Sequence, residues 1–248
     1  MIIATGGRAI LVALEKATGK PIWETPNLKA WRMTHASVMP AEIDGVKQYV
    51  YCTLKGLLGV RADDGRLAWS FPWKFNVAVP VSPVAIQGGR VFQTSCYGAD
   101  TLMVRVTRKE GVFRAEKVFS MTTDEWNSET HTPILHQNHL FAVGKKRRGL
   151  FTCLDLEGKR VWTSQGHASF GLGSYILADG MFFVLEGKTG TLRLLDANTS
   201  GYKELASAQV LSGHDVWSPL ALSDGKLVIR DLARMICLDV SGSPESGD

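Results

Sequence analysis

The sequence has few of the features that place a protein in a class at first sight. No apolar run in its 248 residues approaches the ~18 residues that a membrane-spanning helix needs. Its cysteines, Cys52, Cys96, Cys153 and Cys237, form no C-x-x-C and no vicinal pair, so they indicate neither a zinc site nor a redox pair. The net charge is only +4, from 28 Lys and Arg against 24 Asp and Glu, which by itself implies no nucleic-acid partner.

Signatures of several enzyme classes are missing as well. The sequence contains no G-x-S-x-G, no phosphate-binding loop and no H-E-x-x-H, so hydrolase and nucleotide-binding functions lack support. Residues 1–7 have neither the basic leader nor the apolar core of a secretory signal peptide, and they are typical of a strand that runs into a turn. No amphipathic helix of about ten or more residues is visible, which favours an all-β protein.

Glycine and tryptophan, by contrast, are abundant. The chain holds 25 Gly and 7 Trp and is 45% hydrophobic, which indicates a folded protein with many tight turns and aromatic anchors. The basic run Lys145–Arg148 lies between two strand-like segments, and we expect a solvated hairpin tip; a localisation signal or a polyanion-binding patch is the alternative. The polar tail 241–248 is expected to be disordered.

A recurring unit accounts for the many glycines and tryptophans. A short apolar strand runs into a turn with Asp, Gly or Lys and then into an apolar stretch that ends in Trp. A glycine stands four residues before the Trp in each clear copy, as Gly19, Gly65 and Gly158. The clear copies are Ala13–Trp23, Gly59–Trp69 and Cys153–Trp162; Leu194–Leu205 is weaker, Leu102–Phe119 has a different turn, and Met235–Val240 stops before any Trp.

The spacing of these units predicts the architecture. Trp23 and Trp69 are 46 residues apart, and later intervals stay in the mid-forties. Each interval divides into four short apolar runs separated by turn signals such as Asp44-Gly45 and Asp179-Gly180. A period of this length made of short strands predicts the four-stranded blade of a β-propeller. Radial stacking buries both faces of each sheet, and each Trp contributes roughly 150–250 Å² to that burial.

The motif A-x-x-x-x-T-G-K-x-x-W, unbroken at Ala13–Trp23, resembles the tryptophan-docking motif of the PQQ-like β-propellers. That superfamily includes quinoprotein alcohol dehydrogenases and the propeller lipoprotein of outer-membrane protein assembly. The closest likeness is to bacterial PQQ-binding-like propeller repeat proteins. The resemblance covers about residues 1–240 and implies that Trp23, Trp69 and Trp162 dock each blade onto the next.

We therefore expect an all-β, single-domain propeller over residues 1–240, with blade boundaries near residues 26, 72, 121, 165 and 208. The strand pattern amounts to about five and a half to six four-stranded antiparallel blades, whereas relatives close with about seven or eight. The expectation is an N-terminally truncated ring; the alternative is a six-bladed ring with two thin blades.

The loops that lead into the innermost strands are the expected functional site. They are rich in polar and aromatic residues, and Ser37, Ser82, Thr132 and Ser218 stand in matching positions. Converging around a central funnel, such side chains could bind a planar or anionic ligand; alternatively, they satisfy buried backbone groups and fill the channel. The candidate ligand-binding residues are Trp31, His35, Asn76, Asn127, His131, His167, His214 and Trp217.

Evidence for catalysis is thin. If the chain were a quinoprotein dehydrogenase, the resemblance would imply a calcium ion, a catalytic Asp and a vicinal disulfide. This sequence has no vicinal cysteines and no set of Glu, Asn and Asp residues that matches the calcium site. Glu129 and His131 alternate on one face of an extended segment and are the only candidate metal ligands, with a solvated loop as the alternative.

Three functions stay open: a non-catalytic scaffold that binds a protein or peptide, a propeller that binds a small molecule or PQQ, and a fragment of a quinoprotein oxidoreductase. The sequence favours the scaffold, with no catalytic residues, no nucleic-acid partner and no membrane span. PQQ is implied by the resemblance alone. The resemblance also implies a periplasmic or secreted protein.

Overall fold

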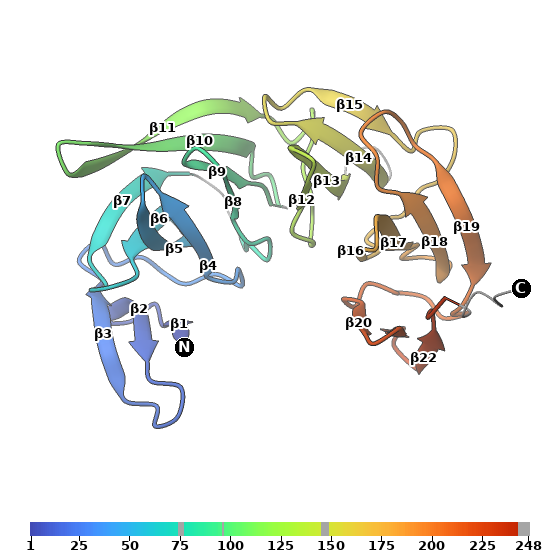
Figure 1. Ribbon diagram of the computed structural model, residues 1–248, viewed down its shortest axis with the longest axis horizontal. Helices are drawn as coiled ribbons and strands as arrows, with labels where there is room; N and C mark the ends of the chain where they lie inside the picture. Colours follow the sequence, from blue (N-terminus) through green and yellow to red (C-terminus); the bar gives the residue numbers. More distant parts are fainter. Residues whose placement is uncertain (74–76, 96, 145–148, 243–248) are drawn as a thin grey trace, which may run out of the picture. The chain divides into compact units, whose positions relative to one another are not determined.

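The computed structural model describes residues 1–73, 77–95, 97–144 and 149–242, which form 22 strands in six antiparallel sheets (Figure 1). None of these residues belongs to a helix, so none lies in a helix long and apolar enough to cross a membrane. The predicted all-β fold is thus confirmed. The predicted site residue Asn76, the thiol of Cys96, the basic run Lys145–Arg148 and the end of the polar tail lie outside the described residues.

Each sheet is a meander in which consecutive strands are neighbours. The first three sheets are β1 (Ile2–Ala4), β2 (Ala9–Leu14) and β3 (Pro21–Pro26); β4 (Met39–Ile43), β5 (Val46–Thr53), β6 (Gly56–Arg61) and β7 (Leu67–Pro72); and β8 (Val84–Ile86), β9 (Arg90–Gln93), β10 (Thr101–Lys109) and β11 (Val112–Met121). The other three are β12 (Ile134–His136), β13 (His139–Gly144), β14 (Leu150–Asp155) and β15 (Arg160–Thr163); β16 (Tyr175–Ala178), β17 (Met181–Leu185), β18 (Thr191–Asp196) and β19 (Glu204–Gln209); and β20 (Ala221–Ser223), β21 (Lys226–Arg230) and β22 (Met235–Asp239). The predicted blade boundaries and the number of blades in a complete ring stay predictions.

The chain forms two compact units. Unit 1 comprises Met1–Leu135 and Leu156–Lys159, and unit 2 comprises His136–Asp155 and Arg160–Asp248. The core of unit 1 runs through its first three sheets and includes Ile10, Tyr51 and Leu58, each with a fully buried side chain. In unit 2 an aromatic cluster anchors the core, with the ring of Phe182 4.7 Å from that of Phe141 and 5.1 Å from that of Phe151.

Tight turns join the first two strands of most sheets. Asp44 and Gly45 have φ values of 47° and 73°, the left-handed conformation that a two-residue type I′ hairpin turn requires at both positions. Asp and Gly tolerate that conformation, which explains why Asp-Gly pairs mark these turns. The same pattern recurs at Asp179–Gly180, Asp224–Gly225 and, without an Asp-Gly signal, Gln137–Asn138.

One tryptophan ties the first sheet to the second. The indole of Trp23, on β3, lies over Gly65 in the turn between β6 and β7, where a Cβ would stand only 2.5 Å from the ring. The indole N–H donates to the carbonyl of Ala62 at 3.1 Å, and the Thr25 hydroxyl donates to the carbonyl of Gly65 at 2.7 Å. Two features of position 65 require glycine. Its φ is +73°, and the Trp23 ring occupies the space of a side chain.

The other aromatic anchors take different positions. Trp69 folds back over its own sheet, where its N–H donates to Gln48 at 2.7 Å and its ring lies against Gly59. Phe119 of β11 takes the docking place in the divergent copy, since a Cβ on Gly158 would stand 2.7 Å from its ring. Trp162 packs edge-on against Tyr202, with ring centroids 6.3 Å apart.

We expect Gly65→Ala to destabilise unit 1 more than Gly19→Ala. Both glycines have φ near +72°, and both changes cost about 1–2 kcal/mol for the left-handed backbone. At Gly65 the methyl group must also displace the Trp23 ring, for about 1–3 kcal/mol more, whereas nothing lies within 4 Å of a Cβ at Gly19. Urea unfolding followed by tryptophan fluorescence measures both variants, and equal losses of stability would contradict the docking contact.

Candidate functional site

The predicted funnel residues are divided between the two units. Trp31, His35, Asn127 and His131 belong to unit 1, and His167, His214 and Trp217 belong to unit 2. All of them lie in loops between sheets, as the sequence indicated, and each unit is described by itself below.

Trp31 lines a pocket of about 310 Å³ in unit 1. Its backbone is fixed by Asn27, which donates from Nδ2 to the Trp31 carbonyl and accepts from the Trp31 N–H, both at 2.9 Å. The ammonium group of Lys29 lies 5.1 Å from the centre of the Trp31 ring, a cation–π distance. The pocket is lined by Lys29, Trp31, Lys55, Gly56, Leu57, Ser70, Phe71 and Pro72.

A neighbouring residue of the same loop is buried and fully engaged. The backbone N–H of Thr34 donates to the Tyr51 hydroxyl at 2.8 Å, and its side chain donates to the Cys52 carbonyl at 2.6 Å. His35 is exposed beside it. The loop therefore holds its backbone rigidly while it presents the imidazole to solvent.

A hydrogen-bonded ladder joins three of these loops. The N–H of Ser37 donates to Ser82 Oγ at 2.9 Å, and the N–H of Ser82 donates to Thr132 Oγ1 at 3.0 Å. Ser37, Ser82 and Thr132 precede β4, β8 and β12, and the hydroxyls of Ser82 and Thr132 each accept a backbone N–H of the preceding loop. The sequence had placed these three residues in register, and in unit 1 they are in contact. In unit 2, Ser174 Oγ donates to the carbonyl of Ser218 at 2.6 Å.

A buried polar cluster lies next to the ladder. The hydroxyls of Thr94 and Thr101 are 2.6 Å apart, Thr101 bonds to the Trp126 carbonyl at 3.1 Å, and the Ser128 N–H donates to Thr94 at 3.1 Å. Gln93 donates its amide to the carbonyls of Val81 and Thr94, and Asn127 donates its amide to the carbonyl of Ser95 at 2.9 Å. We call Gln93, Thr94, Ser95, Thr101, Asn127 and Ser128 the inlet cluster; none of them is more than 2% exposed.

Two acceptors of the inlet cluster have no partner within the described part of the chain. They are Gln93 Oε1 and Asn127 Oδ1, and both belong to side chains whose N–H groups are already used. A buried amide oxygen without a partner costs about 1–3 kcal/mol, so each position favours a hydrogen-bond donor or a cation. The sequence singled out Asn127 but gave no signal for Gln93.

The candidate metal ligands Glu129 and His131 follow the inlet cluster. Ser128 Oγ donates to the His131 carbonyl at 2.7 Å, which fixes this turn through backbone contacts. Over the described ranges, no group of three or more His, Cys, Asp and Glu side chains is arranged to hold a metal ion.

The predicted residues of unit 2 serve separate contacts. His167 stacks on Tyr202 with ring centroids 4.9 Å apart, and His214 Nδ1 lies 2.8 Å from Asp215 Oδ2. Trp217 is 44% exposed. The loop that carries His214 and Trp217 is held at Gly213, whose N–H donates to the buried Asp231 at 3.1 Å.

Buried thiols contribute no reactive group. Burial raises the pKa of the Cys52 thiol far above its usual value, and burial and the charge of Asp155 raise the pKa of Cys153 to about 12. The thiolate is the nucleophile and the metal ligand, so both cysteines stay in the unreactive form near neutral pH.

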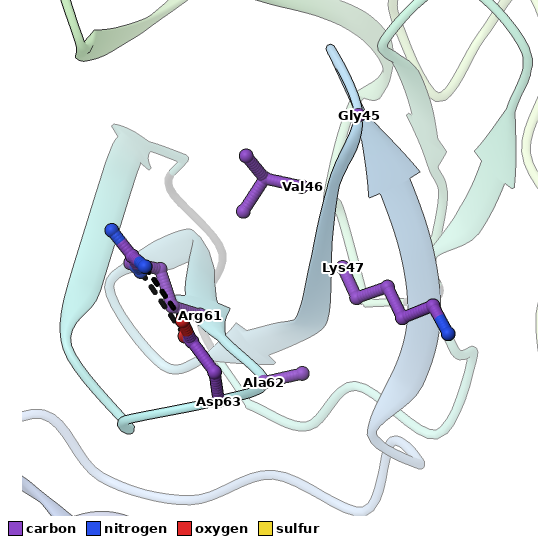
Figure 2. A pocket seen from close by; sticks show the side chains of 6 residues that line it. All are labelled: Gly45, Val46, Lys47, Arg61, Ala62 and Asp63. Atoms are coloured by element: carbon purple, nitrogen blue, oxygen red, sulfur yellow. Dashed lines mark hydrogen bonds and ion pairs between the residues drawn. The ribbon is translucent and has the colours of Figure 1, made fainter.

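A pocket that no sequence motif predicts lies on the second sheet (Figure 2). It has a volume of about 460 Å³ and is lined by Gly45, Val46, Lys47, Arg61, Ala62 and Asp63. A second pocket of about 350 Å³ shares Lys47 and Ala62 with it.

One ion pair dominates the chemistry of that pocket. Arg61 donates two hydrogen bonds to Asp63, at 3.1 and 2.6 Å, and this contact lowers the pKa of Asp63 to about 2. Figure 2 shows Lys47 pointing away from the Arg61–Asp63 pair. Because Asp63 satisfies the guanidinium, the Arg61–Asp63 pair itself offers little net charge to a ligand.

Comparison with known proteins identifies the family. A family model described as "Outer membrane protein assembly factor BamB" matches residues 1–203. No curated protein sequence gives a match. The predicted resemblance to PQQ-like propellers is confirmed by this family model.

Solved structures show the fold. A chain in the crystal structure of the mitotic checkpoint complex is 11% identical, with a TM-score of 0.56 over 90% of this chain and 66% of its own length. Dihydro-heme d1 dehydrogenase NirN in complex with DHE is 11% identical, with a TM-score of 0.49 and coverage of 96% and 60%. AztD of Citrobacter koseri is 12% identical, with a TM-score of 0.42 and coverage of 82% and 68%. The chain spans less than two thirds of the length of the first two of these structures.

We expect Thr132→Val to destabilise unit 1 by about 1–2 kcal/mol, because it leaves the N–H of Ser82 without its acceptor. Thr132→Ser keeps the hydroxyl and should stay within about 0.5 kcal/mol of the parent. Chemical unfolding of both variants measures the difference. If the serine variant loses as much stability as the valine variant, the hydroxyl is not what the ladder uses.

Proposed function

This chain belongs to the family of the outer membrane protein assembly factor BamB, and we propose that it is a non-catalytic scaffold that binds a protein partner in outer-membrane protein assembly. The match of the family model over residues 1–203, which takes in strands β1 to β18, carries the proposal. We propose, from the same membership, that it works in the periplasm at the outer membrane.

The internal contacts of unit 1 support a scaffold role. Trp23 fixes the first sheet to the second, and the ladder of Ser37, Ser82 and Thr132 fixes the loops ahead of three sheets. Loops held in this way lose little conformational entropy when a partner binds, so less of the interaction energy is spent on ordering them. A rigid frame with exposed loops and sheet edges is suited to protein binding.

The experiment is restoration of function in a bacterium that lacks its own BamB-family protein. The chain is exported to the periplasm with a fused signal sequence, and folded outer-membrane barrels are quantified by their heat-modifiable mobility in gels. We expect at least a twofold recovery of the folded fraction, because the scaffold would again hold its partner at the assembly site.

The same chain without the signal sequence is the matched control, since it has the same fold in the wrong compartment. Immunoblotting establishes that the two forms reach equal levels. An exported, folded chain that restores nothing and cross-links to no component of the assembly machinery would refute the scaffold role.

A second candidate is the quinone-binding propeller, with PQQ as its cofactor. The buried oxygens Gln93 Oε1 and Asn127 Oδ1 favour it only indirectly. Both are acceptors, so they suit a calcium ion, which prefers oxygen ligands, and they do not suit the anionic quinone itself. When bound, such a cofactor would supply the redox chemistry, and Gln93 and Asn127 would each offer one neutral amide oxygen to a cation.

Binding of PQQ with calcium tests this candidate through quenching of tryptophan fluorescence. We expect saturable quenching that depends on calcium and weakens at least tenfold in Asn127→Leu, which removes the oxygen. Asn127→Asp should strengthen binding, because it adds a negative charge to the same oxygen position. No uptake by the folded parent chain would eliminate the quinone-binding function.

A further inference from the structure

The longest hairpin of the chain extends beyond its own sheet. β10 has nine residues and β11 has ten, but β9 pairs only with Leu102–Arg105 of β10. Beyond Arg105 the two strands continue as a two-stranded arm (Figure 1). We call Arg105–Lys117 the basic arm.

The basic arm is fixed to unit 1. The N–H of Arg108 donates to Asp44 at 2.7 Å, and the N–H of Val106 donates to the carbonyl of Gly89 at 2.8 Å. Phe113 and Ala115 pack against the core of the first three sheets. The arm is therefore held in place and presents one defined face and one defined edge.

The strand register sorts its side chains between two faces. Val106 pairs with Ala115 and Arg108 with Phe113, on the face that packs inward. The opposite face carries three exposed pairs, which are Arg105 with Glu116, Thr107 with Arg114, and Lys109 with Val112.

Uncompensated positive charge covers the arm. Residues 105–117 contain five cations and two carboxylates, a net charge of +3, where the whole chain carries +4. All seven side chains are exposed, and no ion pair involves any of them where the structure is described. The cations are Arg105, Arg108, Lys109, Arg114 and Lys117, and the carboxylates are Glu110 and Glu116.

The outer edge of the arm is open. The strand order of this sheet is β11-β10-β9-β8, so β11 ends the sheet, and none of the described strands pairs with its second edge. An unpaired strand of ten residues offers a row of N–H and C=O groups to another extended chain. Charged residues often protect such edges from self-association, and like charge on a second copy of this chain would repel it. A strand of opposite charge meets no such barrier.

We propose that an acidic, extended segment of a partner protein adds as a strand to the free edge of β11. Its backbone pairs with Val112–Val118. Because side chains alternate along a strand, its carboxylates lie on the face of Arg105, Lys109 and Arg114, and its apolar residues lie on the face of Phe113 and Ala115. This inference rests on the proposed function for its biological role, because it names the kind of partner that the scaffold binds. A polypeptide fits better than an anionic membrane, since only a polypeptide matches the row of backbone groups.

The test uses a fluorescein-labelled peptide of ten alternating Glu and Val residues with the purified chain. We expect saturable anisotropy that weakens as salt is raised from about 50 to 300 mM, because the exposed charges are screened. Two matched peptides separate the contributions: one with Lys in place of Glu, and one with N-methyl groups on alternate residues, which blocks strand pairing but keeps the charge. Each should bind at least tenfold more weakly.

Arg114→Glu should likewise weaken binding at least tenfold, and Lys16→Glu, which reverses an exposed charge in the β2–β3 turn, should not. Equal unfolding curves show that both variants are folded. No binding, equal binding of the N-methylated peptide, or binding only to phosphatidylglycerol vesicles would overturn the proposal. The peptide assay needs no cell, so it can fail while the restoration experiment succeeds, and the reverse is also possible.

Discussion

Docking of an aromatic ring onto a glycine turn is the contact on which unit 1 depends. A four-stranded sheet has two faces, and it cannot bury both by itself. Trp23 joins the first sheet to the second because Gly65 leaves room for its ring and because the carbonyl of Ala62 accepts its N–H. Phe119 makes the corresponding ring contact with Gly158 but has no N–H to donate. The repeat therefore survives a change of aromatic residue as long as the glycine remains.

The third sheet shows what happens when the glycine turn is replaced. The hairpin of β10 and β11 carries its strands past the position of that turn, and Phe113 and Ala115 take over packing against the core. Trp69, the anchor of the preceding sheet, lies over Gly59 and Gln48 of its own sheet. The different turn between β10 and β11 therefore replaces a docking contact with a projecting arm that has an open edge.

The loops between sheets combine rigidity with polarity. Side-chain hydroxyls at matching positions accept the backbone N–H groups of the preceding loop, so the repeat is enforced by hydrogen bonds as well as by packing. The inlet cluster extends this network into the interior, where most polar groups are satisfied and two amide oxygens are not. A network that is complete except for two acceptors is suited to take up a donor or a cation.

The sequence by itself determined the all-β fold, the family, the Asp-Gly hairpin turns and the matching positions of Ser37, Ser82 and Thr132. These features are local or periodic. The residues that form a tight turn are consecutive, and the alternation of a strand is visible in neighbouring residues. Tertiary structure alone decided that Trp23 docks on Gly65 of the next sheet, that Gln93 joins Asn127 in one buried cluster, and that Arg61 and Asp63 line a pocket. It also decided that residues 105–117 form an anchored arm. These outcomes depend on contacts between residues distant in sequence, and the free energy of such contacts is set by the packing of whole sheets.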